Sequence, residues 1–321
     1  MFPLVVAVLL LAIGTALLLL GADWFLDGAG DLARALGVSA LVFGVILAGL
    51  EPEEMLTAAI ASARGAPALA VGNVIGTNVT IVTAALGLSA LLCPLVISPA
   101  VQRQALIATI VSILPVILLF LGVVTQLEGL LLLVVFVGYT WVLVRVDREA
   151  IKRMEEAESD GDDDEGQEAP QHSPLLWKPI LLTAGGLAAM ALGGPAIVEG
   201  ALQLSERLGI GQGAVGATIV SLGTGAEMLV LGVSAARRKR SDILVGGILG
   251  SFAYNLLVTL GLAATIHPLP VDPQGMFFAL LVMVAVHLML LILIWHGKIP
   301  RVAGALLIGV YIAYLIAVVR V

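Results

Sequence analysis

Long, uninterrupted apolar runs are the feature of this sequence that most limits its fold. Runs such as VVAVLLLAIGTALLLL and LLLLVVFV show no alternation of polar and apolar residues. A bilayer core about 30 Å thick takes an apolar helix of roughly 20 residues, whereas the strands of a membrane β-barrel alternate in polarity. Ten such stretches are centred near residues 12, 47, 80, 112, 134, 188, 222, 256, 285 and 310. The sequence therefore predicts an all-α membrane protein with ten transmembrane helices.

Basic residues and one polar segment indicate how the helices are arranged. If the N-terminus lies outside, every Lys and Arg except Arg64, Arg207 and Arg320 falls on the opposite side, and basic loops stay in the cytoplasm. The polar segment around EEAESDGDDDEGQE has the composition of a disordered linker, and its spacing departs from that of a Ca²⁺-binding EF-hand loop. We expect a cell-membrane protein with both termini outside. Its expected parts are a first membrane half (1–146), an acidic cytoplasmic linker (147–175) and a second membrane half (176–321).

The two membrane halves repeat each other. DGAGDLARALGVSALVFG in the first half corresponds to EGALQLSERLGIGQGAVG in the second, and VGNVIGTN corresponds to VGGILGSF. Matching residues are 172 positions apart in the first pair and 174 in the second. Because each half has five helices, an odd number, the second half must enter the membrane from the opposite face. The sequence therefore predicts two inverted five-helix repeats, an arrangement that places substrate sites near mid-membrane, where helices are broken.

Three carboxylates interrupt the second apolar stretch at G-L-E-P-E-E, residues 49–54. Proline removes a helical hydrogen bond and glycine is conformationally free, so we expect a helix break here and at G-T-G, residues 223–225. Broken backbone at this depth is tolerated where it is buried in protein or lines a cavity, and acids inside a membrane usually mark ion or proton pathways. We therefore expect Glu54 and Glu227 to be a matched pair of central acids that face each other.

The helix after each motif carries residues about one turn apart, so that they share a face. These are Asn73, Thr77 and either Thr80 or Ile81 in the first half, and Gly247, Ser251 and Asn255 in the second. Hard cations such as Ca²⁺ and Na⁺ prefer several oxygen ligands, and no Cys or His cluster suited to softer metals lies at this depth. The expected cation-binding residues are Glu54, Glu227, Glu51, Thr77, Ser251, Asn255, Thr224 and Asn73.

These motifs resemble those of the Ca²⁺/cation antiporter superfamily, and most of all its Na⁺/Ca²⁺ exchanger branch. That family has two inverted repeats, each with a motif like G-T-S-x-P-E followed by G-N-x-x-G-S-N, and ten helices in its prokaryotic members. VGNVIGTNV is similar to the second part of the motif, and GATIVSLGT to the approach to the first. The resemblance spans nearly the whole chain. It implies that Glu54 and Glu227 are the central cation-binding acids and that Thr77 and Ser251 are hydroxyl ligands.

The chain departs from the family motif around the acids. Leu50 and Glu51 stand where the family has Thr and Ser, Glu53 replaces the family proline, and the second motif is one residue short before Glu227. Oxygens that resemble the family's Na⁺ ligands are thus partly lost, while Glu51 adds a charge. Because clustered carboxylates favour protonation of one member, a site built from Glu51, Glu54 and Glu227 makes H⁺ an alternative to Na⁺ as the coupling ion.

The sequence therefore predicts a secondary antiporter that exchanges a divalent cation, foremost Ca²⁺, for Na⁺ or H⁺ by alternating access. Exchange of Mn²⁺ or Mg²⁺ driven by H⁺ is an alternative. A cation channel is another, although channels more often use a ring of like residues from several subunits. The helices carry no arrangement typical of an intramembrane enzyme, so we expect neither an enzyme nor a cofactor. The expected partners are inorganic cations and the lipid bilayer, and no nucleic acid.

Overall fold

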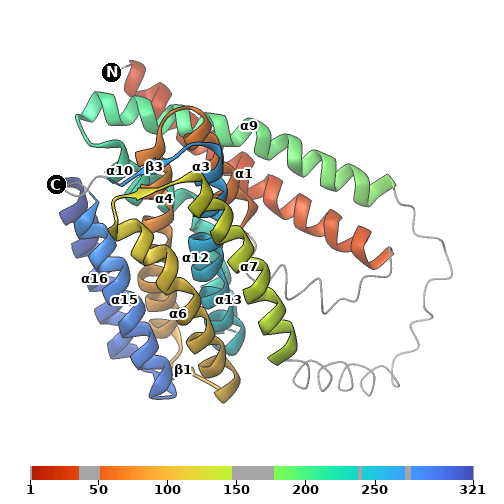
Figure 1. Cartoon of the computed structure of the whole chain (residues 1–321), viewed down its shortest axis with the longest axis vertical. Coiled ribbons are helices and arrows are strands. Elements are labelled where there is room, and N and C mark those ends of the chain that lie inside the picture. Colours follow the sequence, from red (N-terminus) through yellow and green to blue (C-terminus); the bar gives the residue numbers. More distant parts are fainter. Residues whose placement is uncertain (1, 36–50, 147–176, 238–240, 272–275, 321) are drawn as a thin grey trace.

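The molecule is a bundle of membrane-spanning helices (Figure 1). The computed structural model describes residues 2–35, 51–146, 177–237, 241–271 and 276–320, nearly all of them helical. Eight helical segments in these ranges are long and apolar enough to cross a bilayer, and Gln212–Thr224 with Ala226–Val233, bent by 44°, forms a ninth. The predicted all-α membrane architecture is confirmed. The second of the ten expected helices, centred near residue 47, lies largely outside the described ranges, and the whole of the expected linker (147–175) does.

The elements of the two halves follow the same order. In the first half they are α1 (Phe2–Ala35), α3 (Pro52–Ala63), α4 (Pro67–Thr80), the π-helix η1 (Ile81–Ala85), α5 (Leu86–Leu92), β1 (Leu95–Val96), α6 (Pro99–Phe120), β2 (Val123–Val124) and α7 (Gln126–Val146). In the second half they are α9 (Trp177–Leu208), α10 (Gln212–Val215), η2 (Gly216–Val220), α11 (Ser221–Thr224), α12 (Ala226–Arg237), α13 (Ser241–Tyr254), η3 (Asn255–Thr259), α14 (Leu260–Ile266), β3 (Leu269–Pro270), α15 (Phe277–Trp295), β4 (Lys298–Ile299) and α16 (Arg301–Arg320).

The repeat predicted from the sequence is visible in where the elements begin. α12, α13, η3, α14 and β3 each begin 174 residues after α3, α4, η1, α5 and β1. The separation therefore stays constant from the start of α3 onward. Residues that are 174 positions apart in these segments occupy equivalent places in the two halves.

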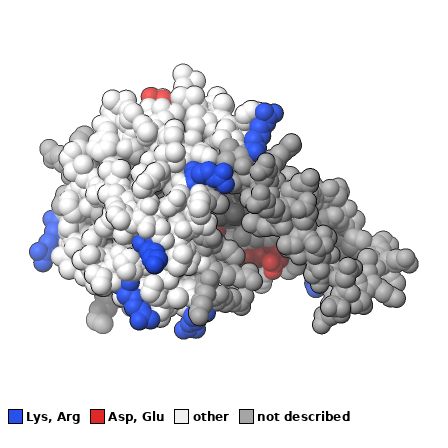
Figure 2. Space-filling view, turned by 90° about the horizontal axis from the view of Figure 1, so that it is seen from below, with Lys and Arg blue, Asp and Glu red and all other residues white. Residues whose placement is uncertain are grey.

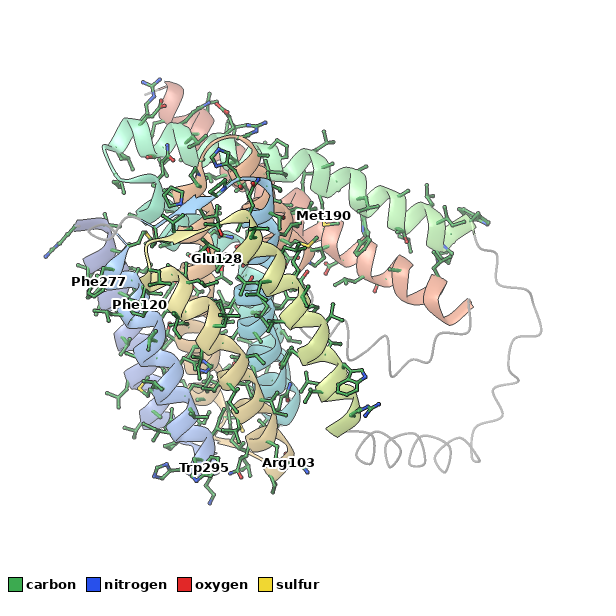
Figure 3. The ribbon with its side chains drawn as sticks, in the orientation of Figure 1. Arg103, Phe120, Glu128, Met190, Phe277 and Trp295 are labelled. Atoms are coloured by element: carbon green, nitrogen blue, oxygen red, sulfur yellow. The ribbon has the colours of Figure 1, made fainter. Side chains whose placement is uncertain are left out.

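Two short strand pairs join the halves. β1 pairs antiparallel with β4, and β2 pairs antiparallel with β3. β1 and β3 are equivalent strands, yet they lie at opposite ends of the bundle (Figure 1). This placement is the one expected of inverted repeats. Figure 3 shows the same two ends by their side chains, with Arg103 and Trp295 at the β1 end and Glu128, Phe120 and Phe277 near the other.

α1 and α9 are long neighbouring helices that lean across one side of the bundle (Figure 1). Glycines at intervals of seven residues line their contact, Gly14, Gly21 and Gly28 on α1 and Gly186, Gly193 and Gly200 on α9. A Cβ atom on Gly21 would come within 2.8 Å of the Gly186 carbonyl oxygen, and one on Gly193 within 2.8 Å of the Gly14 carbonyl oxygen. Small residues allow helix backbones to approach closely in membranes, so these two helices pack backbone to backbone.

The remaining helices surround a polar centre formed where α3, α4, α11 and α13 meet. α4 is buried almost throughout, and so is the segment from Leu244 to Ala264. α6, α7, α15 and α16 cover this centre and expose large apolar side chains on their outer faces. An apolar outer surface around a small polar centre suits a bilayer, where polar groups must be satisfied inside the protein.

Candidate cation-binding site

The acidic motif lies at a helix start in the middle of the bundle. α3 begins at Pro52, which suits the first helical position because that position needs no N–H donor. Glu51 precedes it with a non-helical backbone (φ −115°, ψ 81°). In the second half, Gly225 separates α11 from α12 with a non-helical ψ of 4°. The interruption predicted at residues 223–225 is confirmed. Gly49, the other residue expected to interrupt the first half, lies outside the described ranges.

Glu51 is bound by polar side chains of the second half. Ser251 Oγ donates a hydrogen bond to Glu51 Oε1, and Asn255 Nδ2 donates one of 2.9 Å to Oε2. Glu51 is only 4% exposed, and Ser251 and Asn255 are fully buried. Both carboxylate oxygens of Glu51 therefore rest on the polar face of α13 and η3.

Glu54 is bound mainly by the first half. Asn73 Nδ2 donates a hydrogen bond of 3.2 Å to Glu54 Oε2, and the Asn73 amide oxygen accepts one of 3.3 Å from Thr224 Oγ1. Thr77 lies beside the same carboxylate, but its hydroxyl has no hydrogen-bond partner. Glu54 Oε1 is also buried and unpartnered. A carboxylate oxygen and a hydroxyl oxygen thus lie in one buried place with free lone pairs.

Glu227 lies beside Glu53. Both are the second residue of their helices, α3 and α12, so Glu53 is the repeat equivalent of Glu227. The expectation that Glu54 and Glu227 are matched equivalents is wrong by one position. The error arose because the two acids were matched by residue type, whereas the backbone keeps a constant separation of 174 through the motif. Glu53 is 1% exposed and its Oε2 is unpartnered.

Most but not all of the residues expected on the polar faces of α4 and α13 point toward the acids. Asn73 and Thr77 share a face of α4 toward Glu54, and Ser251 and Asn255 share one toward Glu51. Thr80 is turned elsewhere, because its hydroxyl bonds to the Tyr311 hydroxyl at 3.4 Å. π-Helices, which are frequent at functional sites, begin at the end of this face, at Ile81 in η1 and at Asn255 itself in η3.

The donor set suits a hard cation. It offers carboxylate, hydroxyl and amide oxygens, the ligands that Ca²⁺ and Na⁺ prefer. Within the described ranges, no three His, Cys, Asp or Glu side chains are grouped closely enough to hold one metal ion. The joint role of Glu51, Glu54 and Glu227 stays a prediction, and Glu227 lies within electrostatic range of Glu51. Glu51 and Glu54 nevertheless lie close enough to repel each other, and none of the four acids pairs with a described Lys or Arg.

Sequence reasoning missed one acid of this site and the residue that is equivalent to Glu54. Glu53 is not among the expected cation-binding residues, although it is buried beside Glu227. Met228, which is buried at 6% exposure, holds the place in α12 that Glu54 holds in α3. Both could have been found from the sequence. VGNVIGTN and VGGILGSF are 174 residues apart, and the same separation applied to the acidic motif pairs Glu53 with Glu227 and Glu54 with Met228.

Comparison with known proteins gives a consistent picture. The family model for sodium/calcium exchanger protein matches residues 6–145 and 178–320. The chain is 29% identical to the putative antiporter CaxA of Alkalimonas amylolytica, over 96% of this chain and 97% of that one. It is also 29% identical to the sodium/calcium exchanger MaX1 of Methanosarcina acetivorans, with the same coverage.

A solved structure is similar over almost the whole length. The sodium-calcium exchanger NCX_Mj, soaked with Na⁺ and Sr²⁺, superposes with a TM-score of 0.64 at 26% identity, covering 98% of this chain and 99% of that one. The family comprises transporters and not enzymes. The chain spans nearly the full length of the relatives that it matches. It therefore belongs to the sodium/calcium exchanger family of multi-pass cation antiporters.

Proposed function

We propose that this antiporter exchanges a divalent cation, foremost Ca²⁺, for Na⁺ or H⁺ by alternating access around Glu51 and Glu54. The observation that carries the proposal is that these two buried carboxylates are held by polar side chains from different halves of the chain. An ion bound between them would lie between the polar faces of both repeats, because Glu51 rests on Ser251 and Asn255 and Glu54 rests on Asn73. Movement of one repeat against the other then changes which side of the membrane reaches the ion.

Individual side chains of the site can be assigned separate roles in ion binding. Glu54 Oε1 and Thr77 Oγ1 are buried and unpartnered, which fits direct contact with the ion. The Asn255 amide oxygen is unpartnered as well, on the side of Glu51. Asn73, Ser251 and Thr224 orient the carboxylates and amides through hydrogen bonds. Glu227 with Glu53 adds negative charge next to this pair and favours entry of a cation.

Measurements of ion flux in vesicles would identify the coupling ion. Proteoliposomes containing the full chain would be given Ca²⁺, Mn²⁺ or Mg²⁺ under a Na⁺ gradient alone and under a pH gradient alone. Uptake driven by an opposing cation is expected, with Ca²⁺ the best substrate. Mn²⁺ or Mg²⁺ uptake that follows only the pH gradient would favour the alternative exchanger, and flux that needs no opposing cation would indicate a channel.

We also propose that the β1 end of the bundle faces the cytoplasm. β4 lies at that end and contains Lys298, Arg301 begins the next helix, and Arg103 is placed there in Figure 3. Lys and Arg side chains are spread over this face, seen from below in Figure 2. Basic residues at one membrane surface support a cytoplasmic orientation, with the N- and C-terminal ends outside and residues 147–175 as a cytoplasmic linker. Labelling of single introduced cysteines from either side of intact cells tests the orientation.

A further inference from the structure

The two repeats contribute unequal chemistry to the candidate site. Glu54 is the third residue of α3, and the third residue of α12 is Met228. The second half therefore has no carboxylate at the place where the first half has Glu54. Met228 is buried, so the missing charge is not replaced by solvent at this position.

The polar face of α13 still holds a carboxylate, but this carboxylate comes from the other half. Thr77 lies beside Glu54, and the equivalent of Thr77 is Ser251. Ser251 donates its hydrogen bond to Glu51, and Asn255 holds the second oxygen of the same carboxylate. Each of the two polar faces is thus occupied by one carboxylate, and both carboxylates belong to the start of α3.

The backbone explains how one segment serves both faces. Glu51 lies just before α3 and has non-helical dihedral angles, whereas Glu54 lies within the first turn. The side chain of Glu51 therefore does not follow the helical direction of Glu54, and the two reach α13 and α4 respectively. Two carboxylates that lie within electrostatic range of each other together balance the charge of a divalent cation.

From this geometry we infer that Glu51 supplies, from the first repeat, the carboxylate that the second repeat lacks at Met228. The inference rests on the proposed function, because the shared ligand of both acids is the transported cation. It assigns Glu51 a specific task, which is to complete the second half-site. It also explains why an extra acid is retained three residues before Glu54 without a basic partner among the described residues.

A transposition of the charge tests the inference. Glu51→Ser removes the carboxylate, Met228→Glu restores one at the symmetric place, and the double variant moves the charge from one repeat to the other. Binding of Ca²⁺ and of Mn²⁺ to the purified full chain would be measured by calorimetry, together with vesicle flux. We expect Glu51→Ser to weaken binding of the preferred ion at least 10-fold and the double variant to recover most of that loss. Glu206→Gln, which removes an exposed carboxylate at the end of α9, should bind like the unaltered protein.

A double variant that unfolds cooperatively but binds no more tightly than Glu51→Ser would overturn the inference. If the serine variants do not fold, Glu51→Gln with and without Met228→Glu makes the same comparison with a side chain of native size. The melting temperature in ion-free buffer gives an independent readout. Met228→Glu should lower it by several degrees in the unaltered protein, where two carboxylates would compete for Ser251, and by clearly less when Glu51 is replaced.

This second readout separates the inference from the proposed function. If the unaltered protein neither binds nor moves any of the divalent ions, the proposed function is wrong. The melting comparison still reports whether residues 51 and 228 share one location. Equal destabilisation by Met228→Glu with and without Glu51 would show that they do not.

Discussion

Ser251 donates a hydrogen bond to Glu51 across 200 residues of sequence and thereby connects α13 to the acidic motif before α3. Asn255 adds a second bond to the same carboxylate at 2.9 Å. Glu54, three residues further on, is bound instead by Asn73 of its own half. The site is therefore complete only when the two halves are packed together, which is what a carrier that moves one half against the other needs.

Replacing Glu54 should affect the cation more than the fold. Glu54→Gln keeps the size of the side chain and an oxygen for the Asn73 donor, but it removes the charge beside the unpartnered Thr77 hydroxyl. We expect the Kd for the divalent cation to rise at least about 10-fold, a loss of roughly 1.4 kcal/mol or more in binding, and divalent flux to fall with it. Vesicle uptake and calorimetry would measure the effect, with Glu206→Gln as the matched control. Transport at the normal rate by Glu54→Gln would remove the central acid from the mechanism.

Glu53→Gln should stabilise the ion-free protein. Glu53 is buried beside Glu227 and within electrostatic range of Glu51 and Glu54, so any negative charge on it is unfavourable, and a glutamine cannot carry one. A gain of about 1 kcal/mol corresponds to a rise of about 2–4 °C in melting temperature for chains of roughly 150–250 residues, and a rise of this order is expected here. Thermal unfolding in detergent with a chelator present checks it. A fall in melting temperature would mean that the Glu53 carboxyl makes favourable bonds that outweigh the repulsion.

Substitution by alanine should have opposite effects on stability at two glycines, Gly72 and Gly138. A Cβ atom on Gly72 of α4 would clash with the Gly213 carbonyl oxygen, whereas one on Gly138 of α7 would meet no atom within 4 Å. Gly72→Ala should therefore cost about 1–3 kcal/mol through overpacking. Gly138→Ala should be neutral or stabilising by up to about 1 kcal/mol, because alanine favours the helix. Melting temperatures of the two variants in one detergent compare them directly, and equal values would contradict the close approach of α4 and α10.

The ion pair between Arg64 and Glu199 should contribute little. Its atoms are 3.4 Å apart and both side chains are largely exposed, at 41% and 47%. Exposed pairs typically contribute about 0–1 kcal/mol. A double-mutant cycle with Arg64→Gln and Glu199→Gln should give a coupling energy within that range. A much larger coupling would indicate that the contact between α3 and α9 is shielded from solvent.

The helices could be predicted from the sequence because apolar runs of bilayer length have few other stable conformations. The repeat was also evident, since VGNVIGTN and VGGILGSF lie on equivalent helices, α4 and α13. The alignment of the two acidic motifs with each other was harder to predict from the sequence. Glu54 and Glu227 are both acids, but pairing them shifts the alignment of the two repeats by one residue. The helices begin at Pro52 and Ala226, so Glu53 is the residue equivalent to Glu227.

Other parts of the site depend on tertiary contacts that no local pattern specifies. The bond from Ser251 to Glu51 requires α13 to lie against the start of α3 and Glu51 to leave the helical path. The glycines that line α1 and α9 repeat every seven residues, so a close helix contact could have been expected on each. That α1 and α9 pack against each other could not have been expected, because many helices of the chain contain small residues.

The strand pairs have a consequence for how the chain is made. β1 and β2 belong to the first half, but their partners are β4 and β3 of the second. During synthesis the first half therefore enters the membrane with both of its short strands unpaired, and they remain so until residues 269–299 have been translated. Closure of the two ends of the bundle is thus a late event in biogenesis, and a ribosome that stops early leaves a product with neither end sealed.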